Sequence, residues 1–250
     1  MDGSHQQQPI RGAFSIEKLV RVGFGATKRT NKIVVMLYAE QEGNGDIILW
    51  KINKQNIPFE KYDKVSFEKL MEDYSPEPAF YQESIYPAMR QVAQGIARGE
   101  RLRVNGQPYG AEVEFLKVLE MDEDNVRATF GLGLAYLDRN EIDKGQEVFT
   151  KLVNIEAAFA EEHKHMFNEF GIQLRKNQMY EQALQYYSRA QKLTALDEHL
   201  LYNIGRVLVE TKQFEKARVM LAKAKEVNPE FEEAQKVLDF LDRKLASKTT

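Results

Sequence analysis

The sequence has no cysteine among its 250 residues and only one tryptophan. Without cysteine, the chain can form no disulfide, thiolate zinc site, iron–sulfur cluster or cysteine nucleophile, and a reducing compartment is its simplest location. We therefore expect a cytoplasmic protein. Long apolar runs are also missing, because the longest, residues 33–39, is far shorter than the roughly 18 to 20 residues that a membrane-spanning helix needs. No membrane partner is predicted.

An excess of one charge is missing too, since 35 Lys and Arg stand against 38 Asp and Glu and leave a net charge of −3. This balance lacks the basic footprint of non-specific nucleic-acid binding, so nucleic acid is not an expected partner. The balance conceals a division. Residues 112–169 hold 14 acidic and 6 basic side chains, whereas residues 170–225 hold 10 basic and 5 acidic ones. A partner of opposite polarity would be steered into one orientation.

Motifs of catalysis and metal binding are equally scarce. Residues 23–28 share glycines with a phosphate loop, but the second half of the Walker pattern and the following helix are absent. His163 and His165 are two residues apart in an expected helix, so they point to different faces and do not converge on one ion. No Ser–His–Asp arrangement can be assembled. The sequence predicts no enzyme activity, no cofactor and no metal site.

What the second half of the chain does contain is an internal repeat. Gly133, Gly171 and Gly205 each follow a large apolar residue and have another three positions later, and the glycines are 38 and 34 residues apart. A small residue follows each glycine by twelve positions, and a bulky residue comes four positions later; these are Gly145 and Phe149, Ala183 and Tyr187, and Ala217 and Leu221. This spacing indicates pairs of amphipathic helices that approach closely at the small residues.

The unit resembles the tetratricopeptide repeat, a helix–turn–helix motif of about 34 residues whose size-restricted positions these residues occupy. The resemblance covers residues 86–245 and implies a mainly α fold, a right-handed α-solenoid of three to four helix pairs. We expect helix pairs at 126–159, 160–197 and 198–229, a degenerate pair at 79–125, and a capping helix at 230–246. In the degenerate pair, Gly95 and Gly99 compete for the place of the repeat glycine.

The N-terminal third follows a different period. Residues 33–39 and 47–52 are rich in β-branched and aromatic residues, and the glycine-containing loop between them predicts a β-hairpin, with a third strand at 19–24. Ser66 precedes a short amphipathic helix, which the Ser-Pro-Glu-Pro segment at 75–78 ends. We expect a disordered lead over residues 1–12 and a small α+β element over 13–78, which resembles no family that we recognise.

The resemblance implies that a partner binds the concave face lined by the first helix of each pair. The residues of those helices that packing does not use are Arg127, Phe130, Leu134, Asp138, His165, Asn168, Glu169, Ile172, Arg175, His199, Tyr202, Asn203 and Arg206. Asn203 lies where some relatives use an asparagine to hold a peptide backbone. The apolar and acidic residues Phe130, Leu134 and Glu169 argue against a clamp for a C-terminal carboxylate.

The sequence therefore predicts a non-enzymatic interaction scaffold or adaptor that binds a peptide or helix of another protein. Two alternatives stay open. The chain could form a homo-oligomer by placing its N-terminal element in a neighbour's groove, because a hairpin offers an exposed edge. Less favoured is nucleic-acid binding through Lys28, Arg29 and Lys32 together with the basic C-terminal repeats.

Overall fold

The computed structural model describes residues 9–22, 29–155, 163–193 and 197–246. The chain divides into two compact units: residues 1–94 with 121–123, and residues 95–120 with 124–250. Helix α3 (Tyr86–Val104) begins in the first unit and ends in the second. The glycine-containing segment at 23–28 lies outside the described residues. In the part of the chain that is described, no helix is both long enough and apolar enough to cross a membrane.

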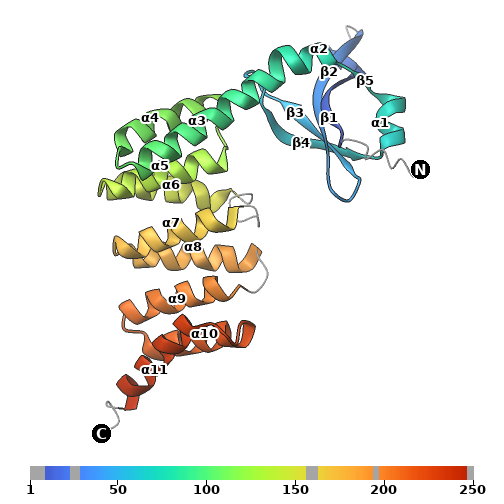
Figure 1. Ribbon diagram of the computed structural model, residues 1–250. Helices are drawn as coiled ribbons and strands as arrows, with labels where there is room; N and C mark the ends of the chain where they lie inside the picture. The colour runs from blue at the N-terminus through green and yellow to red at the C-terminus, as the bar shows by residue number, and fades with distance from the viewer. Residues whose placement is uncertain (1–8, 23–28, 156–162, 194–196, 247–250) are drawn as a thin grey trace, which may run out of the picture. The chain divides into compact units, whose positions relative to one another are not determined.

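The first unit contains a five-stranded antiparallel sheet with the strand order β4-β3-β2-β1-β5 (Figure 1). Its strands are β1 (Arg11–Val22), β2 (Arg29–Gln41), β3 (Ile47–Ile52), β4 (Pro58–Val65) and β5 (Ser75–Pro76). The predicted hairpin is confirmed: β2 and β3 pair antiparallel, and Gln41 lies opposite Ile47 where the loop begins.

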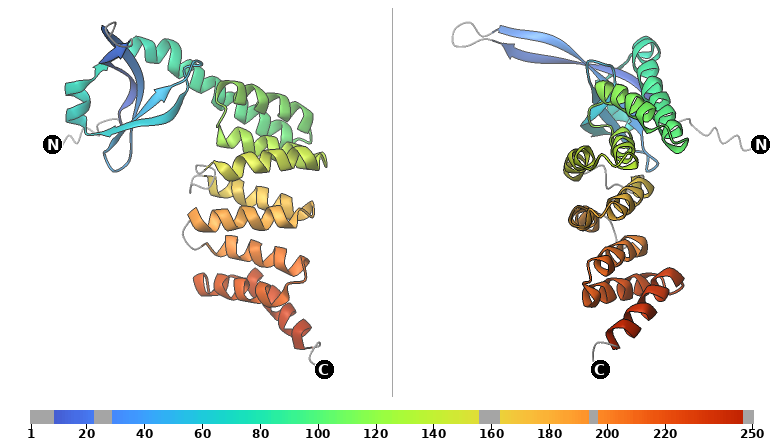
Figure 2. Two further views of the ribbon diagram at one scale, coloured as in Figure 1. Left: turned by 180° about the vertical axis from the view of Figure 1, so that it is seen from behind. Right: turned by 90° about the vertical axis from the view of Figure 1, so that its left-hand side faces the viewer.

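Two expectations for this unit are wrong. The third strand is not confined to residues near 19–24 but begins at Arg11, inside the predicted disordered lead, because Arg11 and Gly12 pair with Glu40 and Ala39 of β2. Strands β4 and β5 were not among the predicted elements. The C-terminal part of β1 and the N-terminal part of β2 extend beyond the other strands and project as a two-stranded ribbon (right-hand view of Figure 2).

The sheet of the first unit buries side chains on both of its faces. Phe14 and Leu37 lie on one face, against Leu70 of helix α1 (Phe67–Asp73), whereas Ala13 and Tyr38 lie on the other face with Ile85. Strand periodicity explains the split, since successive side chains point to opposite faces. The predicted cap of α1 is confirmed, because the backbone N–H of Lys69 donates to Ser66 Oγ at 3.3 Å. Helix α2 (Pro78–Phe80) and a π-helical turn (Tyr81–Ile85) lead into α3.

The second unit is a stack of antiparallel helices, as the repeat predicts (Figures 1 and 2). After α3 come α4 (Pro108–Met121), α5 (Val126–Asp138), α6 (Ile142–Asn154), α7 (Lys164–Lys176), α8 (Tyr180–Leu193), α9 (Glu198–Glu210), α10 (Phe214–Val227) and α11 (Glu232–Ala246). We call α3, α5, α7 and α9 the first helices, and α4, α6, α8 and α10 the second helices.

Close packing at glycine fixes how the two helices of a pair meet. A Cβ added at Gly171 would lie 2.4 Å from the ring of Tyr187, and one at Gly205 would lie 2.7 Å from Leu221. These two glycines therefore receive the bulky residue that follows each of them by sixteen positions, whereas Gly133 faces Phe170 and Val148 and not Phe149. Gly99 has the same relation to Phe115, at 2.6 Å. The structure thus identifies Gly99 as the glycine in register with the later repeats.

The turns inside the helix pairs repeat with the same spacing. Asn140, Gln178 and Lys212 have φ angles of 58°, 61° and 61°, and Gly106 has a φ of 71° in the turn between α3 and α4. Each of these residues follows its repeat glycine by seven positions, and Gly106 follows Gly99 in the same way. The left-handed backbone stops the first helix and starts the second one. The pair α3–α4 is therefore built like the pairs that follow it.

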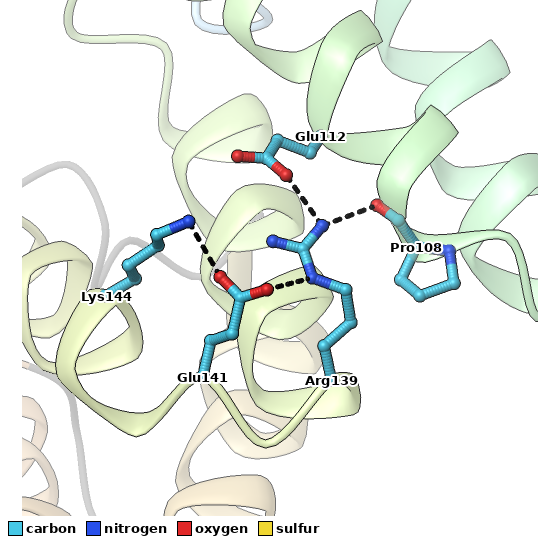
Figure 3. Close-up of polar contacts among 5 residues, drawn as sticks. All are labelled: Pro108, Glu112, Arg139, Glu141 and Lys144. Carbon is cyan, nitrogen blue, oxygen red and sulfur yellow. Dashed lines mark hydrogen bonds and ion pairs between the residues drawn. The ribbon is translucent and has the colours of Figure 1, made fainter.

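A nearly buried arginine joins the α3–α4 pair to the α5–α6 pair (Figure 3). Arg139, whose side chain is 5% exposed, donates to Glu112 at 2.6 Å and to Glu141 at 2.8 Å, and Lys144 pairs with the second oxygen of Glu141 at 2.8 Å. Its guanidinium also lies 4.2 Å from the ring centre of Tyr109. Burial opposes the charge of Arg139, but the hydrogen bonds to Glu141 and Glu112 outweigh that effect and raise its pKa. The cluster is a joint between successive repeats.

Candidate functional site

The face formed by the first helices holds most of the residues singled out from the sequence, and ion pairs cross it from one repeat to the next. Arg103 of α3 pairs with Asp138 of α5 at 3.2 Å, and Arg175 of α7 pairs with Glu210 of α9. The partners are 35 residues apart in both pairs. Because the same contact recurs two repeats further on, Asp138 and Arg175 are positioned by the repeat register and hold neighbouring first helices together.

Arg103 also reaches a second acidic residue, in the helix beyond α5. Its guanidinium donates to Glu169 of α7 at 2.6 Å, and its side chain is only 16% exposed. Burial disfavours the charged form of Arg103, yet hydrogen bonds to Glu169 and Asp138 more than compensate and raise its pKa. Arg127 of α5 pairs with Glu100 of α3 at 2.8 Å. Four of the predicted partner-binding residues, Arg127, Asp138, Glu169 and Arg175, therefore serve contacts within the solenoid.

Two apolar residues predicted on this face are buried instead, so their assignment as partner contacts is wrong. Phe130 is 0% exposed and Leu134 is 4% exposed. The ring of Phe130 lies edge-on to the rings of Phe170 and Tyr186, which belong to the next helix pair. The distances between ring centres are 5.7 Å to Phe170 and 6.4 Å to Tyr186. An aromatic side chain is far more stable in such a cluster than against water. These residues join repeats and are not available to a partner.

The remaining residues gather on α7 and α9. Asn203 is buried and its Nδ2 lies 3.5 Å from Asn168 Oδ1, while Asn168 is half-buried. Arg206 donates from Nη1 to the hydroxyl of Tyr202 at 3.0 Å, and among the described residues it has no carboxylate partner. Ile172, which lies on α7 like Asn168, is also half-buried. This part of the face, which we call the α7–α9 surface, combines amide groups, one cation and two apolar surfaces, those of Ile172 and the Tyr202 ring.

The two predicted histidines differ in what the structure describes. His199 is 58% exposed and lies edge-on to Phe231 at 5.1 Å, and Tyr202 approaches the same ring at 5.1 Å. Phe231 precedes α11 and was not predicted to reach this surface. The side chain of His165 lies outside the described part of the structure.

This face also includes Glu100, Arg103 and Glu210, which were not predicted from the sequence. The signal that identifies Arg103 is the repeat register: Arg103 follows Gly99 by four positions, as Arg175 follows Gly171. The sequence alone does not decide between Gly95 and Gly99 as the repeat glycine, so it does not show that Arg103 corresponds to Arg175.

Comparison with known proteins follows the same division of the chain. A family model described as tetratricopeptide repeat matches residues 174–239. No curated protein sequence matches the chain. Among solved structures, PilF of Pseudomonas aeruginosa is similar with a TM-score of 0.50 and 20% identity, over 63% of this chain and 70% of that one. MamA, from residue 41 onward, of Desulfovibrio magneticus has a TM-score of 0.49 and 20% identity, over 64% of this chain and 88% of that one.

At these identities the likeness to PilF concerns the fold alone. The family match, the repeat register and the helix pairs agree with each other, while the N-terminal sheet is matched by none of these findings. The helical part of the chain is an α-solenoid of the tetratricopeptide repeat type, and residues 174–239 carry the repeats that the family model matches.

Proposed function

We propose that the protein is an interaction scaffold that binds an extended acidic peptide of a partner protein on the α7–α9 surface. The observation that carries this proposal is the set of polar groups that contacts within the solenoid leave available there. Arg206 has no carboxylate partner among the described residues, and its side-chain hydrogen bond there is to the hydroxyl of Tyr202. An acidic side chain is its natural partner, because a bidentate pair with a carboxylate is among the strongest polar contacts.

The neighbouring residues support an extended backbone as the ligand. Amide side chains carry both donors and acceptors and can therefore pair with peptide N–H and C=O groups. Asn168 is half-buried, and its link to Asn203 is at the outer limit of a hydrogen bond, at 3.5 Å. A peptide that replaces this weak contact gains more than it displaces. Residues 170–225 also contain twice as many basic as acidic side chains, which favours an acidic ligand.

Selection of peptides on the full-length chain tests the proposal. We expect a displayed library of random peptides to yield binders enriched in Asp and Glu. Replacing Tyr202 and Arg206 by alanine should weaken a selected peptide by about tenfold or more, since loss of a charge-assisted hydrogen bond costs about 1.5 to 3 kcal/mol. Fluorescence anisotropy of the labelled peptide measures the change.

The matched control is Ser188→Ala, an exposed position on the second helix α8. This variant should bind the peptide like the parent chain. Selected peptides without acidic enrichment, or equal binding by the double variant and the parent, would contradict the placement of the site.

A second candidate function, self-assembly, is favoured by the ribbon of β1 and β2. Leu19 is 70% exposed and Val34 is 61% exposed, although both lie in paired strands. Assembly through the ribbon predicts a sedimentation coefficient that rises with concentration and stays low in Leu19→Lys. The control is Phe59→Lys, because Phe59 is 51% exposed on β4. A full-length chain that remains monomeric over the whole concentration range contradicts this candidate.

A further inference from the structure

The outer face of α4 carries a stripe of exposed apolar side chains. Tyr109, Val113 and Leu116 are 68%, 51% and 41% exposed, and they recur at i, i+4 and i+7. This spacing places them on one face of the helix. Most exposed apolar residues on a protein surface need no explanation when they are scattered singly, but a contiguous patch marks an interaction site.

The repeat supplies an internal comparison for these positions. Relative to the packed residues Ala111 and Phe115, the equivalent positions in α6 are Asp143, Glu147 and Thr150, and those in α8 are Glu181, Gln185 and Ser188. All six are exposed and all are polar. Exposure is therefore a property of the repeat position. The equivalent positions in α10 are Glu215, Val219 and Ala222, so among these helices α4 is distinct in carrying a large apolar side chain at all three positions. Solvent contact alone does not account for Tyr, Val and Leu there.

Charges next to the stripe limit what can cover it. On α4 itself, Glu112 is paired with Arg139 and Lys117 with Glu114, whereas Glu120, one turn beyond Leu116, is exposed and forms no ion pair among the described residues. On α6, Asp143 and Glu147 are exposed and form no ion pair among the described residues. Arg139 contacts both the Tyr109 ring and Glu141, the residue before α6. The start of α6, which carries Asp143 and Glu147, therefore lies beside the stripe.

We propose that the outer face of α4 docks an amphipathic helix of a partner protein, with the partner's apolar face on the stripe and its Lys or Arg residues over Asp143 and Glu147. The stripe has the dimensions of one helix face, since the 14 residues of α4 extend about 21 Å. A second copy of this chain fits less well, because it would bring its own Asp143 and Glu147 to the same edge. This site is separate from the α7–α9 surface, so an experiment can contradict one of the two proposals without affecting the other.

A designed probe tests this docking site on the full-length chain. The probe is a fluorescein-labelled synthetic helix with leucines at i, i+4 and i+7 and lysines along one flank; its matched form has glutamates in place of the lysines. We expect the lysine probe to bind, and Val113→Glu to weaken binding by about tenfold or more, because the substitution removes apolar contact and buries a charge. The glutamate probe should bind poorly, and Glu147→Lys should restore part of its affinity.

The chain offers a close control for Val113. Val219 of α10 occupies the same repeat position and is also 51% exposed. Val219→Glu should leave the affinity for the lysine probe unchanged within about twofold, as expected for distant, independent sites. Equal weakening by Val113→Glu and Val219→Glu, equal binding of the two probes, or no binding of the lysine probe would overturn the proposal. Self-association that Val113→Glu abolishes in sedimentation would also overturn it, since the occupant would then be a second copy.

Discussion

Replacing Gly171 by alanine is expected to destabilise the helical unit by about 3 kcal/mol, the upper part of the usual range for overpacking a well-filled core. The added methyl group would lie 2.4 Å from three atoms of the Tyr187 side chain, which is 0% exposed. The ring has little room to move, because Tyr186 is also fully buried and lies 6.1 Å from it between ring centres. Helices α7 and α8 must therefore separate. Denaturant unfolding followed by circular dichroism measures the loss.

Gly110→Ala is the matched control, because Gly110 is also a glycine inside a helix but its nearest outside atom, on Leu102, would be 3.5 Å from the new methyl group. Alanine at an unhindered helical position is favoured over glycine by about 1 kcal/mol, so this variant should be as stable as the parent or more stable. A smaller side chain opposite Gly171 should relieve part of the overpacking in the first variant. The double variant Gly171→Ala, Tyr187→Leu should then be more stable than the sum of the single effects predicts. Equal stability of Gly171→Ala and Gly110→Ala would contradict the packing scheme.

Replacing Arg139 by alanine should cost about 3 kcal/mol, the lower end of the range for breaking a buried ion pair from one side. The lower end applies because Glu112 and Glu141 keep 19% and 28% of their side-chain exposure. The loss leaves two carboxylates without their shared cation and removes the contact with the Tyr109 ring. The expected fall in the melting temperature of the helical signal is about 6 to 12 °C.

Arg218→Ala controls for the removal of a surface arginine. Arg218 pairs with Asp242 at 2.8 Å, but their side chains are 55% and 56% exposed. An exposed pair of this kind contributes less than about 1 kcal/mol, so the melting temperature should change by no more than a few degrees. If both arginine variants melt at the same temperature, the joint at Arg139 does not hold the repeats together.

Much of the solenoid could be predicted from sequence because packing restricts residue size at fixed intervals. The spacing of Gly171 and Gly205, with Tyr187 and Leu221 sixteen positions later, reports directly which side chains meet. The same rule assigns Gly99 once the positive φ angles of Gly106 and Asn140 align the turns. The turn at Gly106 is hard to align from sequence alone, because glycine, asparagine, glutamine and lysine fill the equivalent turn positions without a shared residue type.

The sheet and the site were less predictable, for a different reason. Edge strands such as β4 and β5 carry polar or proline-containing sequence and depend on long-range pairing, which leaves a weak local signal. On the first-helix face, the sequence does not distinguish a polar residue that binds a partner from one that binds the next repeat. Asp138 and Arg175 do the latter. Phe130 was assigned to that face by its position, but the neighbouring helix pair covers it.

Hydrogen exchange of the full-length chain, with and without a selected acidic peptide, tests most directly whether the solenoid binds a partner on the α7–α9 surface. Exchange reports opening of backbone hydrogen bonds, and a ligand that binds the folded state slows it near the contact. The account predicts slower exchange in α7 (Lys164–Lys176) and α9 (Glu198–Glu210), with α6 and the sheet unchanged. Protection confined to the sheet, or to the second helices, would contradict it.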